Sequence, residues 1–131
     1  GAVVVTTPQD IALIDAKKGL RMFQKVNVPI LGIIENMSVF ICPHCGEVEH
    51  IFGEGGAKRM SEQYGVPLLG ELPLSAKIRE QADSGLPTVA AEPDGKEALM
   101  YREMAMKVAG ALARITKDYT AKMPGIRVVN D

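Results

Sequence analysis

Two cysteines separated by two residues have the clearest chemical potential in this sequence. They are Cys42 and Cys45, within Cys42-Pro43-His44-Cys45-Gly46, and the chain has no other cysteine. A turn of this kind can direct both sulfur atoms to the same side, and Gly46 lets backbone N–H groups approach a thiolate. Two thiolates are half of the ligands of a tetrahedral zinc site or of a [4Fe-4S] cluster. The pair therefore predicts a site that needs further ligands.

Four interpretations of the cysteine pair are open. A second copy of the chain across a two-fold axis would complete a four-cysteine site at a homodimer interface. His50 could instead join the pair in a zinc site within one chain. A dithiol that exchanges disulfides is a third possibility, but such dithiols lie at a helix N-terminus, and here an extended arm containing Val48 follows. In the fourth, the two residues are ordinary reduced cysteines in a turn.

A glycine-rich segment, Gly53-Glu54-Gly55-Gly56, precedes a predicted helix, as a phosphate-binding loop does. It lacks the Gly-Lys-Ser/Thr that completes such a loop, and it follows the cysteine segment rather than a buried strand. We interpret it as a connector. Nothing else in the chain completes a phosphate-binding loop.

Apolar runs without polar alternation indicate three strands that are buried on both faces, over 2–6, 30–34 and 66–72. Amphipathic patterns predict helices over 10–26, 57–64, 75–84 and from 96 onward, and 86–89 is predicted to be a short extended piece. Strands that alternate with helices predict an α/β fold, with a mostly parallel sheet covered by helices on both faces. Residues 38–52 interrupt this alternation and predict a hairpin-like insertion that carries the cysteines at its turn.

The composition is that of an ordinary globular domain. The chain has 131 residues, of which 47% are hydrophobic and 24% are charged. Fifteen basic and sixteen acidic residues give a net charge of -1, so we expect no nucleic-acid partner. No apolar run approaches the roughly 20 residues that span a bilayer, and no signal peptide is evident, so we expect no membrane association. Two reduced cysteines fit a cytoplasmic location.

Five short motifs, taken together and in order, closely resemble the Mrp/ApbC family of iron-sulfur cluster carrier ATPases. These proteins are P-loop NTPases of the deviant Walker type, related to MinD and to the nitrogenase iron protein. The resemblance covers residues 1–89, and its motifs are Thr6-Thr7-Pro8-Gln9-Asp10, Gly32-Ile33-Ile34-Glu35-Asn36-Met37-Ser38, Cys42-Pro43-His44-Cys45-Gly46, Phe52-Gly53-Glu54-Gly55-Gly56 and Gly70-Glu71-Leu72-Pro73-Leu74.

The resemblance implies a doubly wound P-loop NTPase sheet in a homodimer that binds ATP and a bridging [4Fe-4S] cluster. Cys42 and Cys45 would be cluster ligands, with zinc as the alternative metal in the protein as isolated. Asn36 would hydrogen-bond the adenine, and the turn at Pro73 would pack against it. Both lie beyond the carboxyl ends of strands, where open α/β sheets bind ligands. From the residues alone, Asn36 could equally cap a turn, and Pro73 fits a plain turn.

The phosphate-binding loop, the signature lysine and the Mg²⁺ switch of the family belong to an N-terminal half that this sequence lacks. We therefore expect residues 1–122 to be the C-terminal part of one P-loop NTPase-like domain, followed by a tail over 123–131. We expect this chain to have no catalytic residues and no ATPase activity of its own, whereas its parent would bind ATP and Mg²⁺ and deliver clusters to apo iron-sulfur proteins. The alternative is an α/β protein-binding module with a structural zinc knuckle.

Overall fold

Three parallel strands form the central sheet of the computed structural model, which describes residues 1–115. The strands are β1 (Ala2–Thr6), β2 (Ile30–Glu35) and β5 (Leu68–Glu71), in the order β1-β2-β5. The register places Val4 beside Ile33 and Glu35 beside Glu71. All three carboxyl ends therefore meet at one edge. The expected domain end at 122 and the tail over 123–131 lie outside the described residues.

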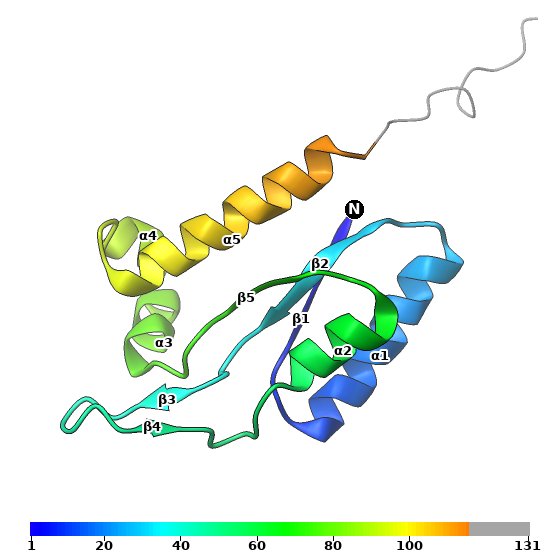
Figure 1. The fold of residues 1–131 in the computed structure, drawn as a ribbon. Helices are drawn as coiled ribbons and strands as arrows, with labels where there is room; N and C mark the ends of the chain where they lie inside the picture. Colours follow the sequence, from blue (N-terminus) through cyan, green and yellow to red (C-terminus); the bar gives the residue numbers. More distant parts are fainter. Residues whose placement is uncertain (116–131) are drawn as a thin grey trace, which may run out of the picture.

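Helices cover both faces of this sheet (Figure 1). On one face, α1 (Asp10–Lys25) contacts β1 and β2, and α2 (Gly56–Tyr64) contacts β2 and β5. On the other face, α5 (Lys96–Ala113) contacts β5 and β2. Two short helices, α3 (Ala76–Asp83) and α4 (Thr88–Ala91), pack against each other, and α4 contacts α5. The predicted α/β class, with a parallel sheet and helices on both faces, is confirmed. The prediction that the first strand is buried on both faces is wrong, because Val5 in β1 is 59% exposed.

The main core lies between the sheet and the α1/α2 layer. Leu20, Ile33 and Met60, from α1, β2 and α2, are fully buried there. On the opposite face, α5 packs against the sheet at a glycine. A Cβ atom at Gly70 would lie 2.5 Å from Cγ of Met104, so glycine at this position lets the helix approach β5 closely.

The last helix is covered less completely than its apolar spacing predicts. Met104 is 5% exposed, whereas Leu112, two turns further on the predicted inner face, is 51% exposed. An 18-residue helix extends about 27 Å, but the 4-residue strand β5 extends only about 13 Å. The C-terminal turns of α5 therefore reach past the strand.

The prediction of an extended piece over 86–89 is wrong, because Thr88–Ala91 forms helix α4. The backbone oxygen of Pro87 accepts hydrogen bonds from Ala90 N at 2.8 Å and from Ala91 N at 2.9 Å. Pro87 has a φ of −56°, a value that suits the start of a helical turn. The buried Thr88 anchors this turn to the rest of the molecule.

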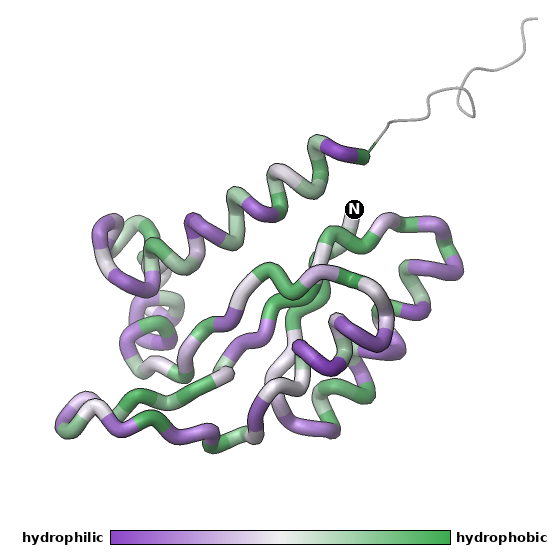
Figure 2. The backbone as a smooth tube through the Cα atoms, in the orientation of Figure 1, coloured by the Kyte–Doolittle hydropathy of each residue, from purple (hydrophilic) through white to green (hydrophobic). Residues whose placement is uncertain are grey.

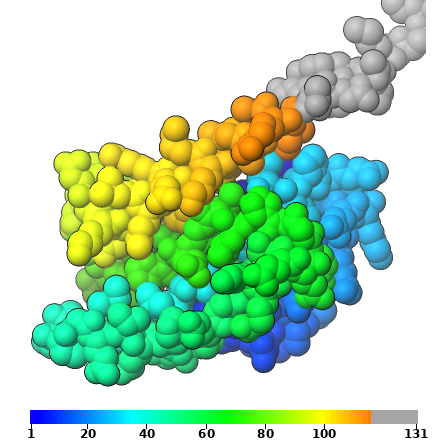
Figure 3. Space-filling view, viewed as in Figure 1, coloured from blue at the N-terminus to red at the C-terminus, as the bar shows by residue number. Residues whose placement is uncertain are grey.

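The cysteine segment forms a separate two-stranded antiparallel sheet (Figure 1). Strand β3 (Phe40–Ile41) pairs with β4 (Val48–Glu49), with Phe40 opposite Glu49 and Ile41 opposite Val48. Figure 3 shows this hairpin as a projection at one end of the molecule. None of the helices over residues 1–115 combines the length and apolarity needed to cross a membrane.

Candidate functional site

The cysteine pair lies in the turn at the tip of the hairpin. Cys42 N donates to the backbone oxygen of Glu47 at 2.9 Å, and Gly46 N donates to the backbone oxygen of Cys42 at 2.9 Å. Gly46 has a φ of +74°, which explains why glycine ends the motif. Both cysteines are free thiols. Cys42 is partly buried and Cys45 is exposed, so the pair is open to an external ligand or partner.

The backbone of the turn favours the charged form of Cys42. Its pKa lies below the ordinary value for a thiol, chiefly because of the hydrogen bond from the backbone N–H of Cys45. The backbone N–H of His44 and the side chain of Cys45 lower this pKa further, whereas partial burial and the nearby carboxylate of Glu49 oppose the shift. The thiolate is the form that binds metal. The turn therefore favours the form of Cys42 that could bind a metal.

Cys42 and Cys45 are the two candidate sulfur ligands among the described residues. Within residues 1–115, no group of three or more His, Cys, Asp or Glu side chains is arranged to hold a metal ion. The possible zinc site of Cys42, Cys45 and His50 is therefore not assembled in this chain. The dithiol-exchange interpretation also loses support, because the turn leads into strand β4 and not into a helix.

Both arms of the hairpin contain apolar residues, as the hydropathy colouring of the backbone in Figure 2 shows. Ile41 is 52% exposed, Val48 54% and Ile51 53%. Apolar side chains gathered around one projecting element are typical of a surface that contacts another protein.

The base of the hairpin is held by backbone hydrogen bonds to the ends of the central strands. Ser38 N donates to the backbone oxygen of Leu72 at 2.9 Å, and Leu74 N donates to the backbone oxygen of Val39 at 2.8 Å. The segments that follow β2 and β5 thus continue to pair beyond the sheet. This pairing is one attachment of the hairpin to the body.

A groove of about 490 Å³ lies between the base of the hairpin and helix α3. It contains Asn36 and Pro73, the two residues expected from the resemblance to contact a nucleotide base. Its lining is Asn36, Met37, Phe40, Pro73, Leu74, Ser75, Ala76, Ile78, Arg79, Ala82 and Asp83. The fold thus brings together two residues that follow different strands. The cysteines do not line this groove, so the two expected sites are separate but adjacent.

The local structure of Asn36 also agrees with the turn-cap interpretation. Its Oδ1 accepts a hydrogen bond from Met37 N at 2.9 Å, and Met37 has a φ of +56°. The side-chain oxygen of Asn36 therefore already has a hydrogen-bond donor, the neighbouring backbone N–H, although Asn36 also lines the groove.

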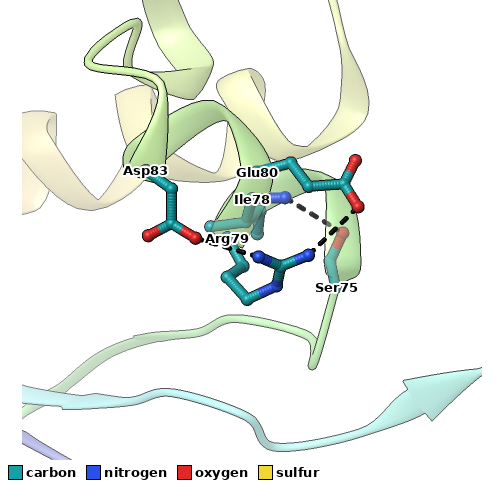
Figure 4. Close-up of polar contacts among 5 residues, drawn as sticks. All are labelled: Ser75, Ile78, Arg79, Glu80 and Asp83. Atoms are coloured by element: carbon teal, nitrogen blue, oxygen red, sulfur yellow. Dashed lines mark hydrogen bonds and ion pairs between the residues drawn. The ribbon is translucent and has the colours of Figure 1, made fainter.

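Sequence reasoning did not identify Arg79, which lines the same groove. Figure 4 shows the contacts of its side chain with Glu80 and Asp83. Ser75 caps α3 by accepting a hydrogen bond from Ile78 N at 3.4 Å. One turn further, Arg79 pairs with Asp83 at 2.9 Å and with Glu80 at 3.1 Å. These exposed pairs orient the guanidinium group but contribute little to stability. The sequence signal that could have identified Arg79 is its place as a basic residue early in the helix that follows Pro73.

Comparison with known sequences assigns a family. The model of a ParA family, described as NUBPL iron-transfer P-loop NTPase, matches residues 1–109. The chain is 58% identical over 112 residues to the iron-sulfur cluster carrier protein of Escherichia coli K12, covering 86% of this chain and 30% of that protein. It is 48% identical over 118 residues to the iron-sulfur cluster transfer protein NUBPL of Dictyostelium discoideum, covering 90% and 36%. The chain thus spans about a third of these relatives.

Solved structures agree with this assignment. A nucleotide-binding protein in complex with ADP from Archaeoglobus fulgidus is 31% identical with a TM-score of 0.60, covering 77% of this chain and 40% of that one. The cell division ATPase MinD from Pyrococcus furiosus is 25% identical with a TM-score of 0.63, covering 84% and 43%. The parallel sheet, the strand-end groove and the family match over most of its length lead to one conclusion: the chain belongs to the ParA/NUBPL family of iron-transfer P-loop NTPases.

Proposed function

We propose that this chain is the cluster-holding part of an ATP-binding iron-sulfur cluster carrier. Two copies would hold one [4Fe-4S] cluster between their Cys42 and Cys45 side chains and pass it to apo iron-sulfur proteins. The observation that carries the proposal is a pair of free thiols, one partly buried and one exposed, at the tip of a projecting hairpin, with no third ligand in the described part of the chain. The names of the bacterial and Dictyostelium relatives support the carrier role.

The ligand chemistry of the turn suits a cluster that is held and then released. The lowered pKa of Cys42 increases the thiolate fraction at neutral pH, which favours binding to iron. Because Cys45 is exposed, thiolates of a recipient can approach the same iron atoms and replace the carrier's ligands one at a time. Such an exchange moves the cluster without any net oxidation or reduction. Two free thiols also fit a reducing cytoplasmic setting.

The neighbouring groove is our proposed contact for the adenine base of ATP. Asn36 would donate from its amide nitrogen to a ring nitrogen, because its oxygen already accepts from Met37 N. The ring of Pro73 would pack against the base, and Arg79 lies on the same groove. The Archaeoglobus relative in complex with ADP supports nucleotide binding. Phosphate binding, Mg²⁺ and hydrolysis would require parts of the whole protein that this sequence does not contain.

Anaerobic reconstitution with iron and sulfide tests the cluster proposal. We expect the wild-type chain to gain the visible absorbance of thiolate-bound iron, and we expect Cys42→Ala and Cys45→Ala to abolish it. His50→Ala is the matched control on the same hairpin, and it should reconstitute like wild type. An unchanged cluster in either cysteine variant would refute the proposal. One tightly bound zinc per chain after anaerobic purification, retained in the monomer, would instead support a structural zinc knuckle.

A further inference from the structure

Glu35, the last residue of β2, is a fully buried acidic side chain that the cysteine chemistry does not use. Its side chain is 0% exposed. Oε1 accepts a hydrogen bond from Ser38 Oγ at 2.8 Å, and Oε2 accepts one from Ala57 N at 2.6 Å. Ser38 lies just before the hairpin, and Ala57 lies in the first turn of α2, just after it. One carboxyl group therefore contacts both ends of the segment that carries the cysteines.

Because Glu35 is buried, losing either of these two hydrogen bonds would be costly. A carboxylate removed from water is costly unless hydrogen bonds replace its hydration. Bonds to a carboxylate are stronger than neutral ones, and the positive end of the α2 dipole adds to the attraction at Ala57. Moving either end of the segment would leave a buried polar atom without its partner.

The hairpin depends on its base for orientation. Its two strands, β3 and β4, have two residues each, and an isolated two-stranded hairpin is at best marginally stable in water. Ile41 and Val48, which face each other across it, are both more than half exposed. The position of the tip relative to the body must therefore come from the attachments at its two ends.

We propose that Glu35 is a positioning residue for the cysteine pair, because its carboxyl group clamps the start and the end of the hairpin segment. The clamp fixes the direction in which Cys42 and Cys45 are presented to a partner. Glu35 directly precedes Asn36, which lines the groove, so neighbouring residues at the end of β2 contact the groove and the base of the hairpin. The role in presenting a cluster rests on the proposed function, whereas the clamp itself can be measured on the metal-free chain.

Hydrogen exchange of the metal-free chain, followed residue by residue by NMR, tests the clamp. Ser38→Ala removes one arm and is a small change that the fold should tolerate. We expect it to accelerate exchange of Leu74 N and Cys42 N, which are hydrogen-bonded to Val39 and Glu47, by about fivefold, the factor expected for one net hydrogen bond. Glu35→Ala removes both arms and should have the larger effect.

Two further variants separate the clamp from a general loss of stability. Glu35→Gln should largely restore slow exchange, because its amide oxygen can accept from Ala57 N and its NH₂ can donate to Ser38 Oγ. Glu71→Gln is the matched control: Glu71 lies beside Glu35 in the β2/β5 register, but its side chain is exposed. It should leave exchange unchanged. Slow exchange at Leu74 and Cys42 in both Ser38→Ala and Glu35→Ala would overturn the proposal.

A spectroscopic measurement links the clamp to the cysteines. After reconstitution with iron and sulfide, we expect Ser38→Ala to alter the visible circular dichroism of the cluster and to speed its loss to a chelator. Glu71→Gln should match wild type, and Glu35→Gln should fall between wild type and Ser38→Ala, because its amide keeps both hydrogen bonds but not the charge. Faster exchange in Ser38→Ala, together with a wild-type chain that takes up no cluster, would support the clamp and contradict the proposed function. Unchanged exchange with normal reconstitution would overturn the clamp and leave the proposed function intact.

Discussion

The central sheet and its helices bury a core of apolar residues, whereas apolar residues of the cysteine hairpin are exposed. In the sheet and its helices, Leu20 and Ile33 are completely buried. In the hairpin, Ile41 and Val48 are paired across the strands but remain more than half exposed. The body is therefore stabilised by its own packing, whereas the hairpin is held by hydrogen bonds at its base.

Because of this difference, one region of the chain provides most of the packing stability and another carries the candidate ligand residues. A rigid body positions the ends of the strands, and the residues able to bind ligands lie beyond those ends or on the projection. Regions with few buried contacts open at low free-energy cost, which suits the cluster exchange proposed for the cysteine pair. Substitutions in the two regions should therefore give distinct outcomes.

The largest expected effect is in the body. Leu20→Ala removes a fully buried side chain between α1 and the sheet and should lower the free energy of unfolding by about 3 kcal/mol. Urea denaturation followed by circular dichroism measures this loss. Leu112→Ala, the same change at a position that is 51% exposed, is the control and should cost less than about 1 kcal/mol. Equal losses would contradict the assigned core.

A pH titration sharpens the comparison at the hairpin tip. Alkylation of Cys42, followed by peptide mass spectrometry, should show a lower pH midpoint in the folded chain than in the same chain unfolded in urea. The reason is that backbone N–H groups of Cys45 and His44 stabilise the thiolate only in the folded turn. Because the folded pKa is the lower one, this stabilisation is present above the unfolded pKa and is lost as pH falls through the folded pKa. Coincident midpoints would show that the turn does not form.

The smallest expected effect is on the stability contributed by the hairpin's apolar residues. Ile41→Ser should change the free energy of unfolding by no more than about 0.5 kcal/mol, because the side chain is already 52% exposed. Val48→Ser should behave in the same way. A loss comparable to that of Leu20→Ala would mean that the hairpin is part of the cooperative core.

The parallel sheet could be predicted because its strands are continuous apolar runs with amphipathic helices between them. The strands over Ala2–Thr6 and Ile30–Glu35 lie where these runs predict them, although Val5 in the first is exposed rather than buried. Helix α4 could not be predicted, because a helix of four residues has no periodicity to detect. Its formation depends on the local geometry at Pro87 and on the tertiary burial of Thr88.

The cysteine pair could be identified from its spacing, but the buried hydrogen bonds at the base of its hairpin could not be predicted. Glu35 ends an apolar run, and only the three-dimensional structure shows that its carboxyl group contacts Ser38 and Ala57, the latter 22 residues away. Similarly, no local pattern links Asn36 to Pro73, because the groove they share is created by the parallel pairing of β2 with β5. Contacts between distant segments are the part that sequence patterns leave undetermined.

The central claim is that each chain supplies half of the ligands of a shared cluster. The most direct test is native mass spectrometry of the reconstituted chain, combined with iron analysis and with Cys42→Ala as the control. We predict a species of two chains with one [4Fe-4S] cluster, which reverts to single chains when the cluster is removed and does not form in Cys42→Ala. A cluster bound stably to a single chain, or a dimer whose cluster persists without Cys42, would contradict the claim.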